Sequence, residues 1–159
     1  MDDAVAPLPE PTERLPPQAL TYWRLKIGLD AGVVVVGALV AGSALGGTWR
    51  WALPLAALAG GLAAVAVVPS LRHRRWRYAV REAEIDIRHG TFVVRRTVVP
   101  IRRVQHVDTE TGPIQSAFEL SAVAFFTAAG KTEIPALASG DAEAVRARIA
   151  RLAQTLDDV

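Results

Sequence analysis

The sequence contains no cysteine, which excludes disulfide bonds, thiol catalysis and cysteine-ligated zinc. Histidine is scarce, and the three present, His73, His89 and His106, show neither an i, i+4 spacing nor an HExxH metal motif. There is no glycine-rich phosphate loop, and Ser121 lies outside any nucleophile-elbow motif. We therefore expect no metal, no cofactor and no enzymatic activity.

Charge gives little support to two further classes of function. The net charge is only +2, and no aromatic platform is interleaved with the arginines, so we expect no nucleic-acid partner. Asp108 and Glu110 are close enough in sequence to form a carboxylate pair. We expect both to lie in a solvated loop, residues 108–113, without an acid–base partner nearby.

Ionisable residues are absent from residues 51–71, and the basic run 72–77 ends this stretch. At about 1.5 Å per residue, a helix of this length spans the roughly 30 Å hydrocarbon layer of a bilayer. A second apolar stretch, residues 27–47, precedes it, and a chain this small could not enclose both. We therefore predict a transmembrane hairpin, residues 19–77, with spans at about 27–47 and 51–71.

Basic residues flank the two predicted spans unevenly. Arg50 is the only charge in the turn between them, whereas Arg24 and Lys26 precede the first span. Four arginines follow the second span: Arg72, Arg74, Arg75 and Arg77. The positive-inside rule then places both termini in the cytoplasm. The preference for Ala, Val, Arg and Gly over Lys and Ile suggests a bacterium with a GC-rich genome, so we expect the protein in the inner or plasma membrane of a bacterial cell. These four arginines also lie at the level of the lipid headgroups.

Asp30 is the acidic residue inside a predicted span. One interpretation is a functional intramembrane acid, because ionisable residues in spans often mark functional sites. The other is an interfacial carboxylate near Arg24 or Lys26. Its position close to the start of the span favours the interfacial carboxylate.

Residues 1–18 are rich in proline and acidic residues. Such a segment buries almost nothing, so we expect a disordered, extended tail. It also lacks the basic start of a signal peptide.

From residue 78 onward the hydropathy pattern changes to period two, which predicts strands. Residues 83–88 alternate between apolar and charged side chains, Gly90 suits a tight turn, and residues 91–96 have the composition of the return strand. Further strands are followed by an amphipathic helix that begins near Asp141. We predict an α+β membrane protein, in which residues 78–159 form a small antiparallel β-barrel or sandwich capped by a C-terminal helix.

Several segments, taken in order, resemble the bacterial pleckstrin-homology (PH)-like domain of the membrane-flanked family, specifically its short YdbS-like members. The most specific is residues 99–107 (VPIRRVQHV). The others are residues 22–24, 76–78, 87–90, 126–130 and 134–137. Glu119 departs from the pattern, because a small residue, often glycine, is expected there. The resemblance implies a cytoplasmic PH-like barrel tethered by two spans, without a family-wide catalytic residue.

The family motif includes four residues to which we assign structural or interaction roles: Pro100, Arg103, Gln105 and Val107. We expect Gln105 to hydrogen-bond a neighbouring strand and Arg103 to pair with an acid. An alternative is that Arg102 and Arg103, like the juxtamembrane arginines, face anionic lipid, where each cation contributes on the order of 1 kcal/mol. For Arg95 and Arg96 we expect solvated strand edges or structural ion pairs with acidic residues of the same domain: Glu84, Asp86 and Glu110.

These patterns predict a non-enzymatic integral membrane protein whose PH-like domain mediates protein interaction at the cytoplasmic face. Sheet edges can add a strand from a partner, which we expect to be a second copy or another membrane protein with PH-like domains. Binding or sensing of anionic lipid and an accessory role in membrane transport or export remain alternatives.

Overall fold

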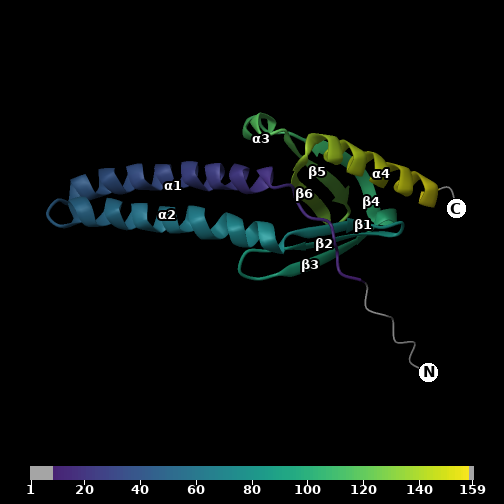
Figure 1. Ribbon diagram of the computed structural model, residues 1–159, viewed down its shortest axis with the longest axis horizontal. Coiled ribbons are helices and arrows are strands. Elements are labelled where there is room, and N and C mark those ends of the chain that lie inside the picture. Colours follow the sequence, from purple (N-terminus) through teal and green to yellow (C-terminus); the bar gives the residue numbers. More distant parts are fainter. Residues whose placement is uncertain (1–8, 158–159) are drawn as a thin grey trace, which may run out of the picture.

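The structure, a computed structural model, describes residues 9–157, with side chains to residue 155. Two antiparallel helices, α1 (Gln18–Leu45) and α2 (Trp49–Arg75), form a hairpin that projects from a smaller C-terminal domain (Figure 1). Both helices are long and apolar enough to cross a membrane, and only 6% of the most apolar stretch of each is buried. A core helix of a soluble protein would be mostly covered, so the predicted hairpin is confirmed.

The C-terminal domain contains two antiparallel sheets of three strands each, which helical segments connect and cover. The first sheet has the order β1 (Arg77–Val80), β2 (Glu84–His89) and β3 (Arg95–Pro100). The second has the order β4 (Val104–Glu110), β5 (Leu120–Thr127) and β6 (Gly130–Ala138). The helical segments are η1 (Ile101–Arg103), α3 (Pro113–Ala117) and α4 (Ser139–Asp157).

A single core joins the hairpin to the domain. Phe125 of β5 and Leu137 of β6 lie in this core together with Ile149 of α4, which is fully buried. Trp23 of α1 and Trp76, which follows α2, belong to the same buried cluster. The aromatic residues at the start and the end of the hairpin therefore fix the domain against it.

Two loops differ from the prediction. Residues 91–94 are a loop rather than the start of a strand, because β3 begins only at Arg95. Gly90 has a φ of 136° and lies so close to Val93 that a Cβ there would clash, which fixes a wider turn. Residues 108–110, in contrast, belong to β4 and not to a solvated loop.

The described part of the N-terminal tail, residues 9–17, is docked on the domain, contrary to the expectation that it buries almost nothing. Leu15 is only 3% exposed and belongs to the core. Glu13 and Tyr78 exchange two backbone hydrogen bonds of 3.1 Å, in an isolated antiparallel bridge. The segment crosses the first sheet in Figure 1. Residues 1–8 of the expected tail lie outside the described part of the chain.

Candidate functional site

The C-terminal domain has one end next to the hairpin and one end far from it. Arg77, two residues after the end of α2, pairs with Arg88, whereas Pro100 pairs with Glu84 at the other end of the same sheet. At about 3.3 Å per residue, β3 carries the chain about 17 Å away from the hairpin. We call these the proximal and distal ends of the domain.

The two sheets do not pair with each other, and their edge strands β3 and β6 line a groove between them. This β3–β6 groove has a volume of about 190 Å³. Its lining comprises Thr97, Val98, Val99, Pro100, Arg103, Thr127, Ala129, Gly130 and Thr132. Among the described residues neither edge pairs with a further strand. Both edges therefore present backbone N–H and C=O groups that an added strand could use.

The groove continues at its distal end into a second hollow of about 550 Å³, the distal hollow, which shares Arg103 and Thr127 with it. Arg102 and Gln105 also line the distal hollow, and all three long polar side chains are exposed. Within residues 9–157, neither arginine forms an ion pair and the Gln105 side chain forms no hydrogen bond. The structural partners expected for Arg103 and Gln105 are thus not found.

The distal position of Arg102 and Arg103 also changes their interpretation. Both follow Pro100, at the end of the domain far from the hairpin, so they face away from the bilayer that the hairpin spans. The remaining motif residues have packing roles: Val107 packs against the core, and Pro100 ends the edge strand β3 as expected for proline.

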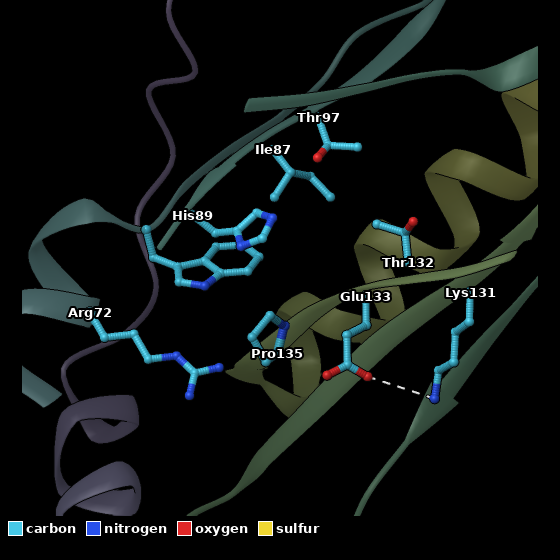
Figure 2. Close-up of a pocket in the computed structure, with 9 residues that line it drawn as sticks. Arg72, Ile87, His89, Thr97, Lys131, Thr132, Glu133 and Pro135 are labelled. Atoms are coloured by element: carbon cyan, nitrogen blue, oxygen red, sulfur yellow. Dashed lines mark ion pairs between the residues drawn. The ribbon is translucent and has the colours of Figure 1, made fainter. Parts of the chain in front are cut away.

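At its proximal end the groove opens into a third hollow of about 320 Å³, the proximal hollow, which shares Thr97 and Thr132 with it. Figure 2 shows Arg72, His89 and Glu133 directed toward this hollow from three different segments. Burial, followed by the charges of Arg95 and Arg72, lowers the pKa of His89. His89 thus shares the proximal hollow with two cations, Arg72 and Lys131, and with Glu133, which lies 3.6 Å from Lys131.

Arg72 separates the proximal hollow from a fourth hollow of about 230 Å³ between α1 and β6, the junction hollow. The guanidinium of Arg72 lies 4.4 Å from the centre of the Trp23 ring, in cation–π geometry. Lys26, Asp30 and Glu133 also line the junction hollow. Asp30 thus lies where α1 meets the domain, which agrees with the interfacial interpretation of this carboxylate.

The other juxtamembrane arginines have different environments. Arg74 is exposed, and Arg75 donates hydrogen bonds to the carbonyl oxygens of Thr91 and Phe92. Arg77 is part of β1 and donates to the carbonyl oxygen of Trp76, at 2.7 Å. All of them are at the proximal end, as a headgroup-level position requires.

Asp86 is a buried carboxylate on the outer face of the first sheet, under the docked N-terminal segment. Its side chain has no exposed area, and Arg96 binds both of its oxygens at 2.7 and 3.0 Å. Arg81 adds a longer contact of 3.4 Å, and both arginines also donate to the carbonyl oxygen of Pro9. This network confirms a structural ion pair for Arg96 and explains why the acidic, proline-rich segment docks here. In the described chain, Arg95 forms no ion pair with the acids proposed for it.

The three histidines lie apart from one another. His73 bonds to the carbonyl oxygen of Leu15, and His89 lines the proximal hollow. His106 lies 2.8 Å from Asp108 and stacks on Phe126. Asp108 thus has a neighbouring histidine, which the sequence did not predict, but both side chains are more than half exposed. Within residues 9–157 no three histidine, aspartate or glutamate side chains are grouped as metal ligands.

Sequence reasoning identified the arginines at both ends of the groove but missed its walls. Thr97, Thr132 and Glu133 were recognised only as strand residues, and no motif marks them. One feature of the sequence could have indicated the groove. Pro100 ends β3, and because proline occurs in sheets mainly on edge strands, it marks β3 as a strand with an unpaired edge.

Comparison with known proteins gives consistent results along nearly the whole chain. Residues 28–153 match the bacterial PH domain family. The UPF0699 transmembrane protein YdbS of Bacillus subtilis (strain 168) is 38% identical over 155 residues, covering 94% of this chain and 97% of that protein. The UPF0699 transmembrane protein YdbT of the same organism is 32% identical over 69 residues, which are 43% of this chain and 14% of that protein. No solved structure matches significantly.

Proposed function

The chain belongs to the bacterial PH domain family, and we propose that this transmembrane protein binds an extended segment of a partner protein in its β3–β6 groove. The observation that carries the proposal is the presence of two unpaired strand edges on opposite walls of one groove. A strand that enters there can form backbone hydrogen bonds with one edge or with both, and this is the physical basis of strand addition.

The ends of the groove add chemical selectivity to this backbone recognition. Arg102 and Arg103 are exposed at the distal end and form no ion pair with any other described residue. They suit an acidic side chain or a terminal carboxylate of the bound segment, because arginine binds carboxylates with two parallel hydrogen bonds. The partner that we propose is an extended segment with an acidic residue at the distal end of the groove.

We propose that the segment belongs to a second copy of this protein or to another membrane protein with PH domains. A short relative that spans the whole chain and a longer relative that matches only part of it occur in one organism. Two membrane proteins with related domains on the same side of one bilayer would meet in its plane, where their domains can contact each other.

The absence of native cysteine allows a direct test with single-cysteine variants. A thiol-reactive photo-cross-linker attached to Thr132→Cys lies on the groove wall. Attached to Thr155→Cys, it lies on the exposed surface of α4 and serves as a matched control. In native membranes we expect one discrete cross-linked species from position 132 and none from position 155. Equal cross-linking at both positions, or none at either, would contradict strand addition in the groove.

A charge in the groove wall provides a second test of the same proposal. Thr97→Glu places a charged side chain on the edge strand, where charge opposes the addition of a further strand, and Thr155→Glu is the control. We expect Thr97→Glu to abolish co-purification of differently tagged copies, or of the partner, without reducing membrane insertion. Unchanged association would refute this mechanism.

Headgroup binding at the junction is a second candidate function, and the position of Arg72 favours it. Arg72 borders both the proximal and the junction hollow and is accompanied there by Lys26. We expect Arg72→Gln to reduce the anionic lipid retained by the full-length protein in native mass spectrometry, while Arg102→Gln leaves it unchanged. An equal loss in both variants would show that retention reflects net charge rather than this site.

A further inference from the structure

The loop between β2 and β3 exposes apolar side chains that the fold itself does not use. Phe92 is 79% exposed and Val93 is 71% exposed, and Val94 is also exposed. These three consecutive residues form the tip of the loop, which we call the FVV loop. A contiguous apolar tip of this kind in a small domain marks an interaction surface.

The FVV loop lies beside the end of α2. Arg77 pairs with Arg88. Trp76, which precedes Arg77, and His89, which follows Arg88, therefore lie side by side next to the end of α2. The Trp76 and His89 rings are 5.9 Å apart, and Arg75 donates hydrogen bonds to the carbonyl oxygens of the loop, including Phe92 at 3.3 Å. Figure 1 shows the loop turned back alongside the last turns of α2.

This position corresponds to the boundary between the headgroups and the hydrocarbon. Arg75 lies four residues beyond Leu71, the last residue of the uncharged stretch, which is a rise of about 6 Å along the helix. The side chain of Phe92 extends from a backbone held at the level of Arg75. Phe92 is therefore within reach of the depth at which the apolar part of α2 ends.

The charges around the loop match the same environment. Arg75, which bonds to the loop, and Arg95, which follows Val94, flank the apolar tip, and Arg74 is exposed next to Arg75 on α2. Cations beside exposed apolar and aromatic side chains are typical of elements that lie in the membrane interface, with the charges at the headgroups and the apolar groups below them.

We propose that the FVV loop inserts into the interface of the same bilayer that α1 and α2 span. The loop is then a third membrane contact beside the two helices. The shared core fixes the domain to the hairpin, so a third contact beside the end of α2 orients the hairpin and the domain together relative to the bilayer. The proximal end of the domain faces the lipid, and the distal hollow with its arginines faces the aqueous phase.

Lipid is the proposed contact of the FVV loop, whatever binds in the β3–β6 groove. Arg75, the last residue of the spanning hairpin, holds the loop beside α2 through hydrogen bonds to the carbonyl oxygens of Thr91 and Phe92. A protein partner that covers the loop is an alternative outcome that the experiment distinguishes.

The test uses a spin label on single-cysteine variants of the full-length protein in bilayer nanodiscs. Val93→Cys labels the tip with Phe92 intact, and Val98→Cys is the matched control, because it is an exposed valine of β3 nearer to the distal end. Val98 also lines the β3–β6 groove, so each nanodisc holds a single copy of the protein and no second copy can cover the control position. We expect the ratio of accessibility to oxygen over accessibility to a water-soluble nickel chelate to be several-fold higher at position 93 than at 98.

The results that would overturn the proposal are equally specific. A label at position 93 that is as accessible to the chelate as at position 98 would place the loop in water. A label shielded from both reagents would show a protein cover instead of lipid. Adding Phe92→Asp to the Val93→Cys variant should shift position 93 to the aqueous signature, and an unchanged signature would show that Phe92 does not hold the loop in the bilayer.

Discussion

Glu119 adopts a backbone conformation that favours glycine. Its φ is 54°, in the left-handed region, and its carbonyl oxygen accepts a hydrogen bond of 2.9 Å from the backbone N–H of Ser139. This is the position at which the sequence departs from the small residue that the family resemblance led us to expect. The chain therefore keeps the turn with a residue that is strained in it.

We predict that Glu119→Gly raises the free energy of unfolding by about 1 kcal/mol, because it removes the left-handed penalty of a residue with a side chain. The Glu119 side chain is exposed, so little packing is lost. Glu143→Gly, at an exposed position inside α4, should have the opposite effect of about 1 kcal/mol. Thermal unfolding of both variants in one detergent measures the difference, and a lower midpoint for Glu119→Gly would contradict the prediction.

His89 makes the stability of the domain dependent on pH. Burial, with the charges of Arg95 and Arg72, lowers its pKa in the folded protein, so the unfolded chain binds a proton more readily. The contribution of the neutral His89 imidazole to the free energy of unfolding is fully present above the pKa of the unfolded state, about 6.5. This contribution is lost as the pH falls through the lower pKa of the folded state. We predict a thermal midpoint that falls below about pH 6.5.

The same measurement on His89→Gln isolates this effect. Glutamine cannot be protonated in this range, so the fall in the midpoint should be smaller than in the unchanged protein. His106→Gln serves as the control, because His106 lies on the exposed surface next to Asp108. An equal pH dependence in the unchanged protein and in His89→Gln would assign the effect to other groups.

At the scale of the elements, helix packing in the hairpin depends on adjacent glycines with different surroundings. A Cβ at Gly61 would lie 2.9 Å from the Cβ of Ala31, whereas a Cβ at Gly60 would meet no atom within 4 Å. The two positions share the same helix and nearly the same depth. They therefore form a matched pair for testing how closely α1 and α2 approach each other.

We predict that Gly61→Leu destabilises the hairpin by about 1–3 kcal/mol, the usual range for overpacking, while Gly60→Leu has little effect. Both substitutions bring a similar gain in helix propensity, so the difference between them reports packing. The midpoint of thermal unfolding in detergent, followed by tryptophan fluorescence, is the measurement. Equal midpoints would mean that the helices do not contact each other at Gly61.

The elements also show what the sequence could and could not predict. The hairpin was evident because residues 51–71 carry no charge over a length that can span a bilayer, and a second apolar stretch precedes them in a chain too small to enclose both. Residues 91–94 were wrongly predicted as strand, because exposed aromatic and β-branched residues such as Phe92 and Val93 have the same local pattern as residues that face a core. The hydropathy pattern of a segment shows which side chains are apolar, and only the tertiary structure shows what they contact.

Docking of the N-terminal segment and formation of the groove could not be predicted for a related reason. Residues 9–17 bind because Asp86 and Arg96, far away in the sequence, create a buried polar site under Pro9. The groove exists because β3 and β6 end their respective sheets, which depends on strand order. The period of hydropathy along a segment determines neither the order of strands in a sheet nor an ion pair between residues far apart in the sequence.

At the scale of the whole molecule, the hairpin places the N-terminal segment and the C-terminal domain on the same side of the membrane. The docked residues 9–17 bind the first sheet, and both helices join the domain at one end (Figure 1). The turn between the helices, residues 46–48, is therefore on the other side. The uneven distribution of arginine leads us to propose that the domain side is the cytoplasm.

This proposal predicts opposite labelling of two single-cysteine variants in intact cells. Thr48→Cys lies in the turn and should react with a membrane-impermeant maleimide added outside, since the turn would face the exterior of the inner membrane. Thr155→Cys on α4 should react only after the membrane is permeabilised, because α4 covers the domain on the cytoplasmic side. The reverse pattern would invert the topology. It would also place the groove, its arginines and any partner outside the cytoplasm, so this assay decides in which compartment a partner is to be sought.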